Sequence, residues 1–411
     1  MNQSKYRNQF PIFSTQDKLV YLDSAATALK PTSVIASMSE YYSSYSANIH
    51  RGLYPIALKA TDEFDSARIA VKNLIHASSA NEIVFTKGAT ESLNLIAHSV
   101  AKIIPKNSEI LTTICDHHSN FVPWQQVAKM HDLKFGVMTI NPLTVTEELL
   151  LQIVRDSVTE ETSVLALPLV TNVFGVIFPV KAMIKVAREK NPDVLVVIDA
   201  CQAVAHCAID VVDIDADFLV FSGHKMFGPT GVGVMYGKSE ILARMPPYQF
   251  GGDMISEVTI EATTFNDAPS KFEAGTPPIG EVIGLKSAIS FIQEVALDVL
   301  KSHARELQEY AVSALKKSFG DSIQLYTPRY LQSSSIINFN LKDCHAHDVA
   351  QILAENDVCV RGGHHCAQPL HDFLSIPASC RASVSIYNTT EDIDQFIAHL
   401  KRCFTVLGNS I

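Results

Sequence analysis

Apolar and polar residues follow two different periodicities along the chain. Four short runs are apolar without polar alternation and read as buried strands, at residues 82–86, 164–170, 194–200 and 217–223. Amphipathic stretches lie between the runs, such as residues 67–75, whose apolar positions are spaced for one face of a helix. Apolar strands that alternate with helices are typical of a mostly parallel sheet covered on both sides. The pattern therefore predicts an α/β fold.

The pattern changes after about residue 285. A long helical stretch over residues 287–319 leads to shorter apolar runs near residues 334–341, 358–363 and 381–388. This mixture of helix and short strands predicts a smaller C-terminal α+β domain. We place the boundary near residue 290, which gives a large domain over 21–290 and a small domain over 291–411. Residues 1–20 form an N-terminal segment that could pack on the small domain.

Composition narrows the class of protein and its partners. The chain has 411 residues, of which 47% are hydrophobic and 18% are charged, as in a well-buried metabolic enzyme. A net charge of −10 without a long basic run argues against nucleic acid or an anionic membrane as a partner. The N-terminal residues lack the apolar core of a signal peptide, and no apolar run has membrane-spanning length. We therefore expect a cytoplasmic enzyme.

Eight cysteines are scattered along the chain and form no CxxC pair. This spacing indicates neither a disulfide framework nor a zinc ribbon. In a reducing compartment a cysteine is either a small buried hydrophobe or a reactive thiol. We expect most of the eight cysteines to be small buried hydrophobic residues.

The residues after the first apolar run could hold an anion. Thr86-Lys87-Gly88-Ala89-Thr90-Glu91 follows a predicted strand and opens a predicted helix. Backbone N–H groups at a helix N-terminus, together with a hydroxyl, form a cradle for phosphate. The P-loop spacing is missing, and an ordinary helix N-cap explains this stretch about equally well.

Two further strand ends carry chemically useful side chains. Asp199 ends the apolar run 194–200 and is followed by Gln202, so its carboxylate is expected in the ligand crevice of a parallel sheet, although a helix N-cap is the alternative. Lys225 follows the run 217–223 and precedes a glycine-rich stretch, which makes it a candidate Schiff-base amine. Taken alone, Lys225 would be read as a surface lysine.

These three features, in this chain order, suit pyridoxal phosphate, because the acid pairs with the ring nitrogen and the lysine holds the aldehyde. The sequence resembles fold-type I pyridoxal-phosphate enzymes of the class V aminotransferase group, and specifically group II cysteine desulfurases of the SufS/CsdA type. The resemblance covers nearly the whole chain. Its most specific stretches are residues 48–52, 116–120 with 122–125, 222–225, 272–277 and 361–369. It implies a large domain with a mostly parallel mixed sheet and a smaller C-terminal α+β domain.

The resemblance also implies roles for residues around the cofactor. His117 would stack on the ring and relay protons. Asp199 would hold the pyridine nitrogen, Gln202 the ring hydroxyl and Lys225 the aldehyde. The phosphate would be bound by Thr90, Ser222 and His224, with Thr276 reaching it from the partner subunit of a homodimer.

For the substrate, L-cysteine, the resemblance implies that Arg381 clamps the carboxylate with help from Asn172. Residues at the entrance to the site would be His50, Arg51 and Arg361. The chain departs from the family pattern at Asp116, where glutamate is common, at Ala89, where a second threonine is common, and at Gly363. Ala89 removes one hydroxyl that could bind phosphate.

Cys366 is the candidate sulfur carrier. It lies in a loop with Arg361, His364 and His365 close in sequence, and nearby cationic or hydrogen-bonding groups favour a thiolate. A metal site and a merely structural cysteine are the alternatives. Adjacent His-His-Cys is poor geometry for one tetrahedral zinc, and we expect no metal. With the resemblance, Cys366 is expected to take sulfur from L-cysteine as a persulfide and to release L-alanine.

Other functions remain open from the sequence. The same fold could prefer selenocysteine or cysteine sulfinate. It could also act as an aminotransferase, but the cysteine-containing loop at residues 363–369 argues against this function. A non-catalytic sulfur-relay or scaffold protein would not need Asp199, Lys225, Arg381 and Cys366 together. The resemblance implies a SufE- or SufU-type sulfur acceptor protein and iron–sulfur cluster assembly as the pathway. The sequence does not separate the two acceptors.

Overall fold

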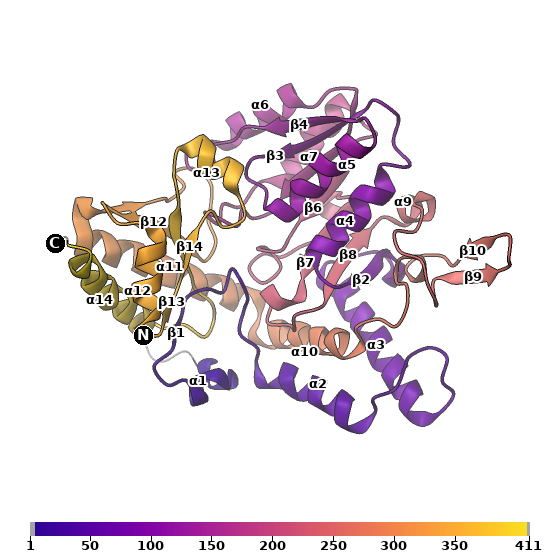
Figure 1. Cartoon of the computed structure of the whole chain (residues 1–411), viewed down its shortest axis with the longest axis horizontal. Helices are drawn as coiled ribbons and strands as arrows, with labels where there is room; N and C mark the ends of the chain where they lie inside the picture. Colours follow the sequence, from indigo (N-terminus) through magenta and orange to yellow (C-terminus); the bar gives the residue numbers. More distant parts are fainter. Residues whose placement is uncertain (1–4, 409–411) are drawn as a thin grey trace.

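A seven-stranded sheet forms the centre of the larger part of the molecule in this computed structural model, which describes residues 5–408 (Figure 1). The strand order is β2-β8-β7-β6-β5-β3-β4, and only β8 runs antiparallel to its neighbours. The strands are β2 (Ile83–Thr86), β3 (Glu109–Thr113), β4 (Lys134–Met138), β5 (Thr162–Pro168), β6 (Leu195–Asp199), β7 (Phe218–Ser222) and β8 (Gly233–Gly237). All four predicted apolar strands are present, and the α/β prediction is confirmed.

Both faces of this sheet are buried, which explains why its strands lack polar alternation. Val84 packs with one core, whereas its neighbours Ile83 and Phe85 pack with another on the opposite face. Helices on the Val84 side are α4 (Ala89–Val100), α5 (Val122–Met130) and α9 (Ser239–Arg244). Helices on the other side are α2 (Thr32–Ser44), α3 (Pro55–Leu74), α6 (Glu147–Ser157), α7 (Val180–Lys190), α8 (Val211–Ile214) and α10 (Ile279–Val295).

A second, antiparallel sheet has the strand order β11-β12-β15-β14 and its own hydrophobic core. Its strands are β11 (Ile323–Leu325), β12 (Ile336–Leu341), β14 (Arg361–Gly363) and β15 (Ser379–Ser383). Helices that pack on it are α11 (Leu297–Phe319), α12 (Ala346–Ala354) and α14 (Thr390–Val406), whereas α13 (Gln368–Leu374) packs with the core of the larger part. The expected mixture of helix and short strands is therefore present in the C-terminal part of the chain.

The long helical stretch expected over residues 287–319 is two helices. Ala296 has φ 71°, a left-handed conformation that ends α10 and starts α11. Neither proline nor glycine marks this break in the sequence. α10 continues past residue 290 and packs with α2 and α3, whereas α11 contributes to the second core from Ala304 onward. The division of the chain near residue 290 stays a prediction.

The N-terminal segment contacts both parts of the molecule. Phe10 packs on the ring of Phe227 in the larger part and on that of Tyr387 in the C-terminal part. Arg7 forms an ion pair with the buried Asp392 at the start of α14. Short elements of this region are η1 (Arg7–Gln9), α1 (Ile12–Thr15) and β1 (Val20–Tyr21), which pairs in parallel with β13 (Val358–Cys359).

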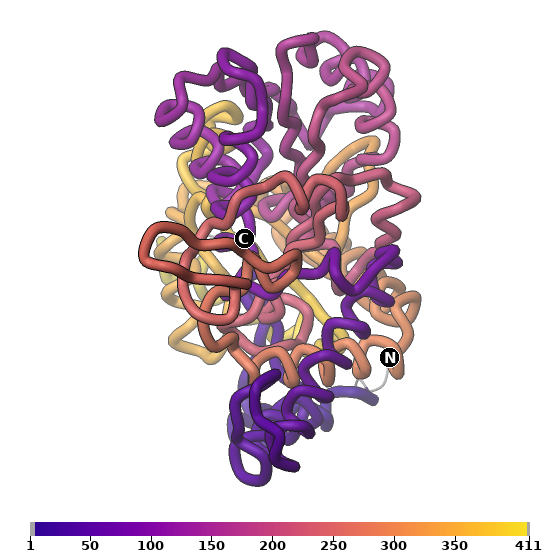
Figure 2. The backbone as a smooth tube through the Cα atoms, turned by 90° about the vertical axis from the view of Figure 1, so that its right-hand side faces the viewer, coloured from indigo at the N-terminus to yellow at the C-terminus, as the bar shows by residue number. Residues whose placement is uncertain are grey.

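One hairpin, β9 (Ile255–Val258) with β10 (Thr263–Phe265), projects from the body of the molecule (Figures 1 and 2). The remaining 3-10 turns are η2 (Ala80–Glu82), η3 (His118–Asn120), η4 (Gly223–Lys225), η5 (Ser270–Phe272) and η6 (Gly320–Ser322). Among the residues that the structure describes, no helix has the length and apolarity to cross a membrane.

Candidate active site

Three strands bring their candidate residues to one edge of the large sheet. Asp199 pairs with Val220 two residues before Ser222, and Ser222 pairs with Gly233. Gly233 also pairs with Thr86, so the turn at Gly88 lies next to the end of β7. A side chain on Gly233 would place its Cβ 2.4 Å from the Cα of Gly88, so glycine is required there. The sheet register thus joins the predicted anion cradle to the other two strand ends.

The cradle is the N-terminus of α4. The helix begins at Ala89, whose backbone N–H donates to the Ser222 hydroxyl oxygen at 2.9 Å. Thr90, in the first turn, lines a cavity of about 550 Å³ together with His117 and His118. The start of α4 therefore lies against the Ser222 hydroxyl, at the position where the sequence predicts a phosphate.

Asp199, Gln202 and Lys225 follow β6 and β7 at this same edge. Asp199 is 7% exposed, and one carboxylate oxygen accepts the N–H of Cys201 at 2.9 Å. The Gln202 amide donates to the Ala25 carbonyl at 2.8 Å. The carbonyl of His224, beside Lys225, accepts the N–H of Ala28 at 2.9 Å. Residues 25–28 thereby close the site from the N-terminal side.

His117 follows β3 and is held in one tautomer. Its Nδ1 accepts the backbone N–H of Ser119 at 3.1 Å and lies 2.8 Å from the Ser119 hydroxyl. The proton of the neutral ring is therefore on Nε2. Burial, reinforced by the nearby Lys225 ammonium, lowers the pKa of His117 to about 3. With its pKa lowered in this way, the His117 ring is neutral near pH 7.

Asp116 supports the turn that carries His117. Its carboxylate accepts hydrogen bonds from the Thr112 hydroxyl at 2.7 Å, the Thr113 N–H at 3.1 Å and the Asn120 amide at 2.7 Å. Asn120 in turn accepts from the indole N–H of Trp124 at 3.0 Å. Asp116 is fully buried, and this burial raises its pKa well above the usual range. Asp116 therefore positions the turn that carries His117. The sequence showed only that Asp116 replaces the glutamate common in the family, and gave no sign of this structural role.

The loop that carries Cys366 is fastened to this turn. The N–H of His118 donates to the carbonyl of Cys366 at 2.7 Å, and His118 Nε2 accepts the N–H of Gln368 at 3.1 Å. The Asn172 amide donates to the carbonyl of His365 at 2.6 Å. Both His365 and Cys366 have positive φ, 52° and 58°, so the loop makes a tight left-handed turn. These bonds join Cys366 directly to His118, the residue that follows His117.

Arg361 is the cation at the thiol of Cys366. Its guanidinium Nη2 donates to the sulfur at 3.5 Å. His365 does not act as a second cation, because its ring is buried and its Nε2 lies 3.0 Å from the Ser379 carbonyl. Burial and the Arg381 guanidinium lower the pKa of His365 to about 2. Arg361, and not His365, is therefore the cation beside the sulfur of Cys366.

Burial distinguishes most other cysteines from Cys366, which is half-buried. Burial raises the pKa of the thiol, which keeps it protonated and unreactive. This shift affects Cys115, Cys201, Cys207, Cys359, Cys380 and Cys403. Among the described residues, no group of three or more His, Cys, Asp or Glu side chains could hold a metal ion.

Arg381 lies fully buried on β15, next to the Cys366 loop. Its Nη1 donates to the carbonyl of Asn172 at 2.7 Å, while its Nε and Nη2 have no hydrogen-bond partner among the described residues. The carboxylate of Asp23 is 3.5 Å from Nη2. Two unpartnered N–H groups on one buried guanidinium provide a fork for a carboxylate. Asp23 was not among the predicted site residues, and its contact with Arg381 spans most of the chain.

Three predicted site residues lie elsewhere in the single chain. Thr276 is exposed on the segment that leads into α10. His50 and Arg51 are exposed before α3, and Arg51 pairs with Asp253 beside the hairpin. Figure 1 shows α3 and the hairpin far from α13 and the Cys366 loop. One chain therefore brings together Cys366, Arg361 and the cofactor residues, without Thr276, His50 and Arg51.

A sequence model of the class V aminotransferase family matches residues 20–396. The chain belongs to this family. Within it, the chain is 40% identical over 413 residues to a probable cysteine desulfurase of Halalkalibacterium halodurans, covering 100% of both proteins. It is also 40% identical over 409 residues to the cysteine desulfurase of Yersinia pseudotuberculosis, covering 98% of both. The relatives confirm the resemblance to cysteine desulfurases.

Solved structures of cysteine desulfurases have the same fold. CsdA of Escherichia coli superimposes with a TM-score of 0.88 at 34% identity, covering 99% of both chains. The apo enzyme of Thermococcus onnurineus gives a TM-score of 0.90 at 34% identity, covering 98% of both. This cysteine desulfurase chain therefore has the fold of the pyridoxal-phosphate transferases, as predicted.

Pyridoxal 5′-phosphate is the cofactor of the family, and the donor set of the site fits it. The α4 N-terminus and Ser222 offer donors for a phosphate, and the strand-end Asp199 offers an acceptor for a ring N–H. Lys225, on the turn that directly follows β7, supplies an amine, and His117 supplies a neutral aromatic face. Ala89 in place of a threonine leaves its backbone N–H directed to Ser222.

Proposed function

We propose that this enzyme removes sulfur from L-cysteine and holds it as a persulfide on Cys366. The observation that carries the proposal is the anchoring of the Cys366 loop to the His117 turn, with Arg361 at the thiol. A sulfur carrier must reach the reacting substrate, and these contacts keep the Cys366 backbone beside the cofactor residues. Arg381 would then act on the carboxylate of the substrate, and Lys225 on its α-carbon.

Arg381 would bind the substrate carboxylate through its unpartnered Nε and Nη2, while Asn172 and Asp23 fix the guanidinium. Pyridoxal phosphate supplies an electron sink for the bond broken at the α-carbon. Lys225 would move the proton at this carbon, since it directly follows β7 at the edge where the cofactor residues meet. His117 would hold its proton on Nε2, as its Nδ1 is already an acceptor.

The Cys366 thiolate would attack the sulfur of the substrate. The bond between the substrate's β-carbon and sulfur breaks, a sulfur–sulfur bond forms, and the β-carbon receives a proton. One L-cysteine and one protein thiol thus give one L-alanine and one persulfide, without an external oxidant. A persulfide is a reversible modification of the thiol, so the sulfur remains transferable.

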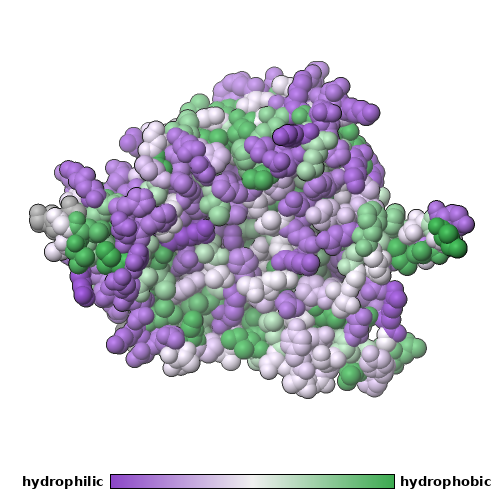
Figure 3. All heavy atoms as spheres, in the orientation of Figure 1, coloured by the Kyte–Doolittle hydropathy of each residue, from purple (hydrophilic) through white to green (hydrophobic). Residues whose placement is uncertain are grey.

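We propose further that the enzyme acts as a homodimer. Thr276, His50 and Arg51 would then complete the site of the partner subunit. Apolar side chains are exposed near these residues: Leu53 is 90% and Ile260 is 100% exposed. Figure 3 shows such apolar atoms on the projecting hairpin, which suits burial against a second copy.

The sulfur would pass to a SufE- or SufU-type acceptor protein, and the purpose would be iron–sulfur cluster assembly in the cytoplasm. Support comes from the SufS-type loop at residues 361–369 and from the partial exposure of Cys366. Alanine formation should rise when the right acceptor is added, because removal of the persulfide regenerates the thiol. An acceptor that leaves the rate unchanged would be excluded as the partner.

The cofactor assignment has a direct test in Lys225→Ala. We expect this variant to lose the yellow absorbance of lysine-bound cofactor and all alanine formation from L-cysteine, because it removes the amine on the turn that directly follows β7. Lys181→Ala, which removes an exposed ion pair to Asp213, serves as the control and should keep both. Retained absorbance and turnover in Lys225→Ala would exclude Lys225 as the cofactor lysine.

A further inference from the structure

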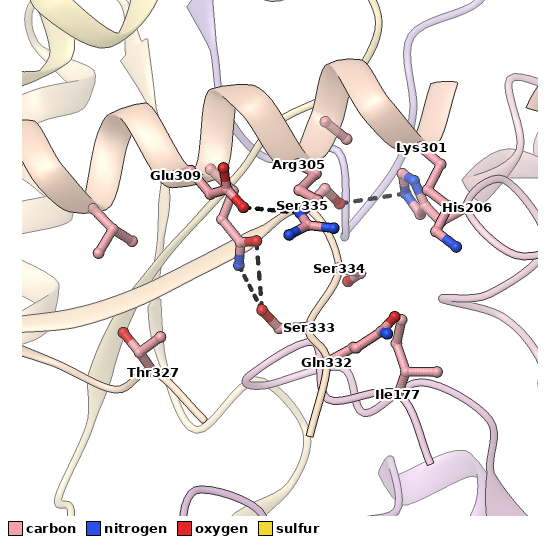
Figure 4. A pocket seen from close by; sticks show the side chains of 13 residues that line it. Ile177, His206, Lys301, Arg305, Glu309, Thr327, Gln332, Ser333, Ser334 and Ser335 are labelled. Atoms are coloured by element: carbon pink, nitrogen blue, oxygen red, sulfur yellow. Dashed lines mark hydrogen bonds and ion pairs between the residues drawn. The ribbon is translucent and has the colours of Figure 1, made fainter. Parts of the chain in front are cut away.

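A second cavity lies between α11 and the segment 332–335, away from the cofactor residues (Figure 4). Its volume is about 320 Å³. The walls come from four parts of the chain that are distant in sequence: α11, residues 327–335, Ile177 and His206. None of the residues with a predicted catalytic or cofactor role lines it.

The charged side chains of this cavity favour an anion. Lys301 and Arg305 are one helical turn apart on α11, and Figure 4 shows Arg305 pointing from the helix toward Ser333 and Ser334. Glu309 accepts from Arg305 Nε at 2.8 Å, which leaves the two terminal nitrogens of the guanidinium for another partner. Two cations and one carboxylate give the lining a net positive charge.

Uncharged polar groups line the opposite wall. Ser333, Ser334 and Ser335 are consecutive, and Ser333 accepts from the Gln308 amide at 3.0 Å. The Ser335 hydroxyl lies 3.3 Å from Nε2 of His206, whose buried Nδ1 has no hydrogen-bond partner among the described residues. Burial lowers the pKa of His206 to about 4, so the ring is neutral. A ligand oxygen could therefore accept from hydroxyls as well as from the cations.

Apolar groups complete the lining. Ile177, Ala304 and Val312 contribute aliphatic surface beside the polar wall. A cavity with convergent polar groups and an aliphatic side is typical of a site for a small organic molecule. We propose that this cavity binds a small organic oxyanion, either a carboxylate or a phosphate monoester, with Arg305 and Lys301 as its principal contacts.

The position of the cavity links it to the substrate site. Ile177 N–H donates to the Gln332 carbonyl at 2.9 Å, and Ser334 N–H donates to the Gly175 carbonyl at 2.8 Å. The turn at Gly175 also carries Asn172, which holds both Arg381 and the Cys366 loop. An occupant that contacts segment 332–335 therefore changes the KM for L-cysteine, since it acts on the turn that positions Arg381.

Titration calorimetry on the cofactor-loaded enzyme tests the binding, with inorganic phosphate and n-butyrate as probes. We expect saturable binding of at least one probe and a loss of tenfold or more in affinity in the double variant Lys301→Gln, Arg305→Gln. Lys316→Gln, an exposed lysine on the same helix, should bind as the unaltered enzyme does. Thr327→Trp, which fills the cavity but keeps both cations, should also lose binding.

Each possible outcome decides the proposal. Failure of both probes to bind, or equal binding by the double variant, overturns it. Loss of binding in the double variant but full binding in Thr327→Trp indicates attraction to surface charge only and also overturns it. For the link to the substrate site, the KM for L-cysteine is measured with and without the bound probe. An unchanged KM at saturation with the probe refutes that link while leaving the binding result intact.

Discussion

Glu273 offers a quantitative test of how the segment before Thr276 is held. Its Oε1 accepts from Arg68 Nη1 at 2.8 Å and from the Phe85 N–H at 2.7 Å, and its Oε2 accepts from Arg68 Nη2 at 2.9 Å. Both side chains of the pair are only 9% exposed. In Glu273→Gln, the new NH₂ group faces a donor in either orientation of the amide. Arg68 then keeps its charge in a buried site without a carboxylate.

Breaking a buried ion pair by removing one partner costs about 3–5 kcal/mol. Unfolding entropy of about 2.1 cal/mol/K per residue gives roughly 0.9 kcal/mol/K for a chain of this length, so the Tm should fall by about 3–6 °C. Differential scanning calorimetry at fixed protein and cofactor concentrations measures this shift. Glu40→Gln, which breaks an exposed pair with Lys59, is the matched control.

The control should shift the Tm by about 1 °C or less, because exposed pairs contribute about 0–1 kcal/mol. The double variant Arg68→Met, Glu273→Met should regain most of the loss, since no buried charge remains unpaired. Equal shifts in Glu273→Gln and Glu40→Gln would refute the reasoning. So would a double variant that is as unstable as Glu273→Gln.

Two further predictions concern Arg381 and His365. Asp23→Asn should raise the KM for L-cysteine about three- to tenfold with less than a twofold change in kcat, because Asp23 fixes the Arg381 guanidinium that binds the substrate carboxylate. Steady-state kinetics measure both constants. An unchanged KM would exclude this role of Asp23. The folded-state pKa of His365, about 2, lies below the unfolded value of 6.5, so the stability that it contributes is full above pH 6.5 and falls as the pH drops toward 2. At pH 5 the loss is about 2 kcal/mol. The Tm difference between the unaltered enzyme and His365→Gln should therefore narrow from pH 7 to pH 5, and a constant difference would show that His365 is not responsible.

Much of the fold and of the cofactor site follows from local sequence. Buried strands read as apolar runs because both faces of the sheet are covered, and the ends of neighbouring strands must meet at one edge. Asp199, Ser222 and Lys225 could therefore be placed together without a structure. The break at Ala296 could not, because its residue type does not mark a left-handed conformation.

Contacts between residues far apart in the sequence also could not be predicted from the sequence alone. The bond between His118 and Gln368 spans 250 positions, and that between Arg68 and Glu273 spans 205. Proximity in sequence was misleading for His365, whose ring turns away from the adjacent thiol toward Ser379. Such orientations depend on packing that no local pattern encodes.

The central claim is that Cys366 takes the sulfur of L-cysteine. Its most direct test is alanine formation by cofactor-loaded Cys366→Ala, with Cys359→Ala as the matched control, since Cys359 is also half-buried. We predict that Cys366→Ala keeps the cofactor absorbance but forms alanine at least about a hundredfold more slowly, and carries no persulfide. Cys359→Ala should form both alanine and the persulfide as the unaltered enzyme does. Full alanine formation from L-cysteine by Cys366→Ala would contradict the account.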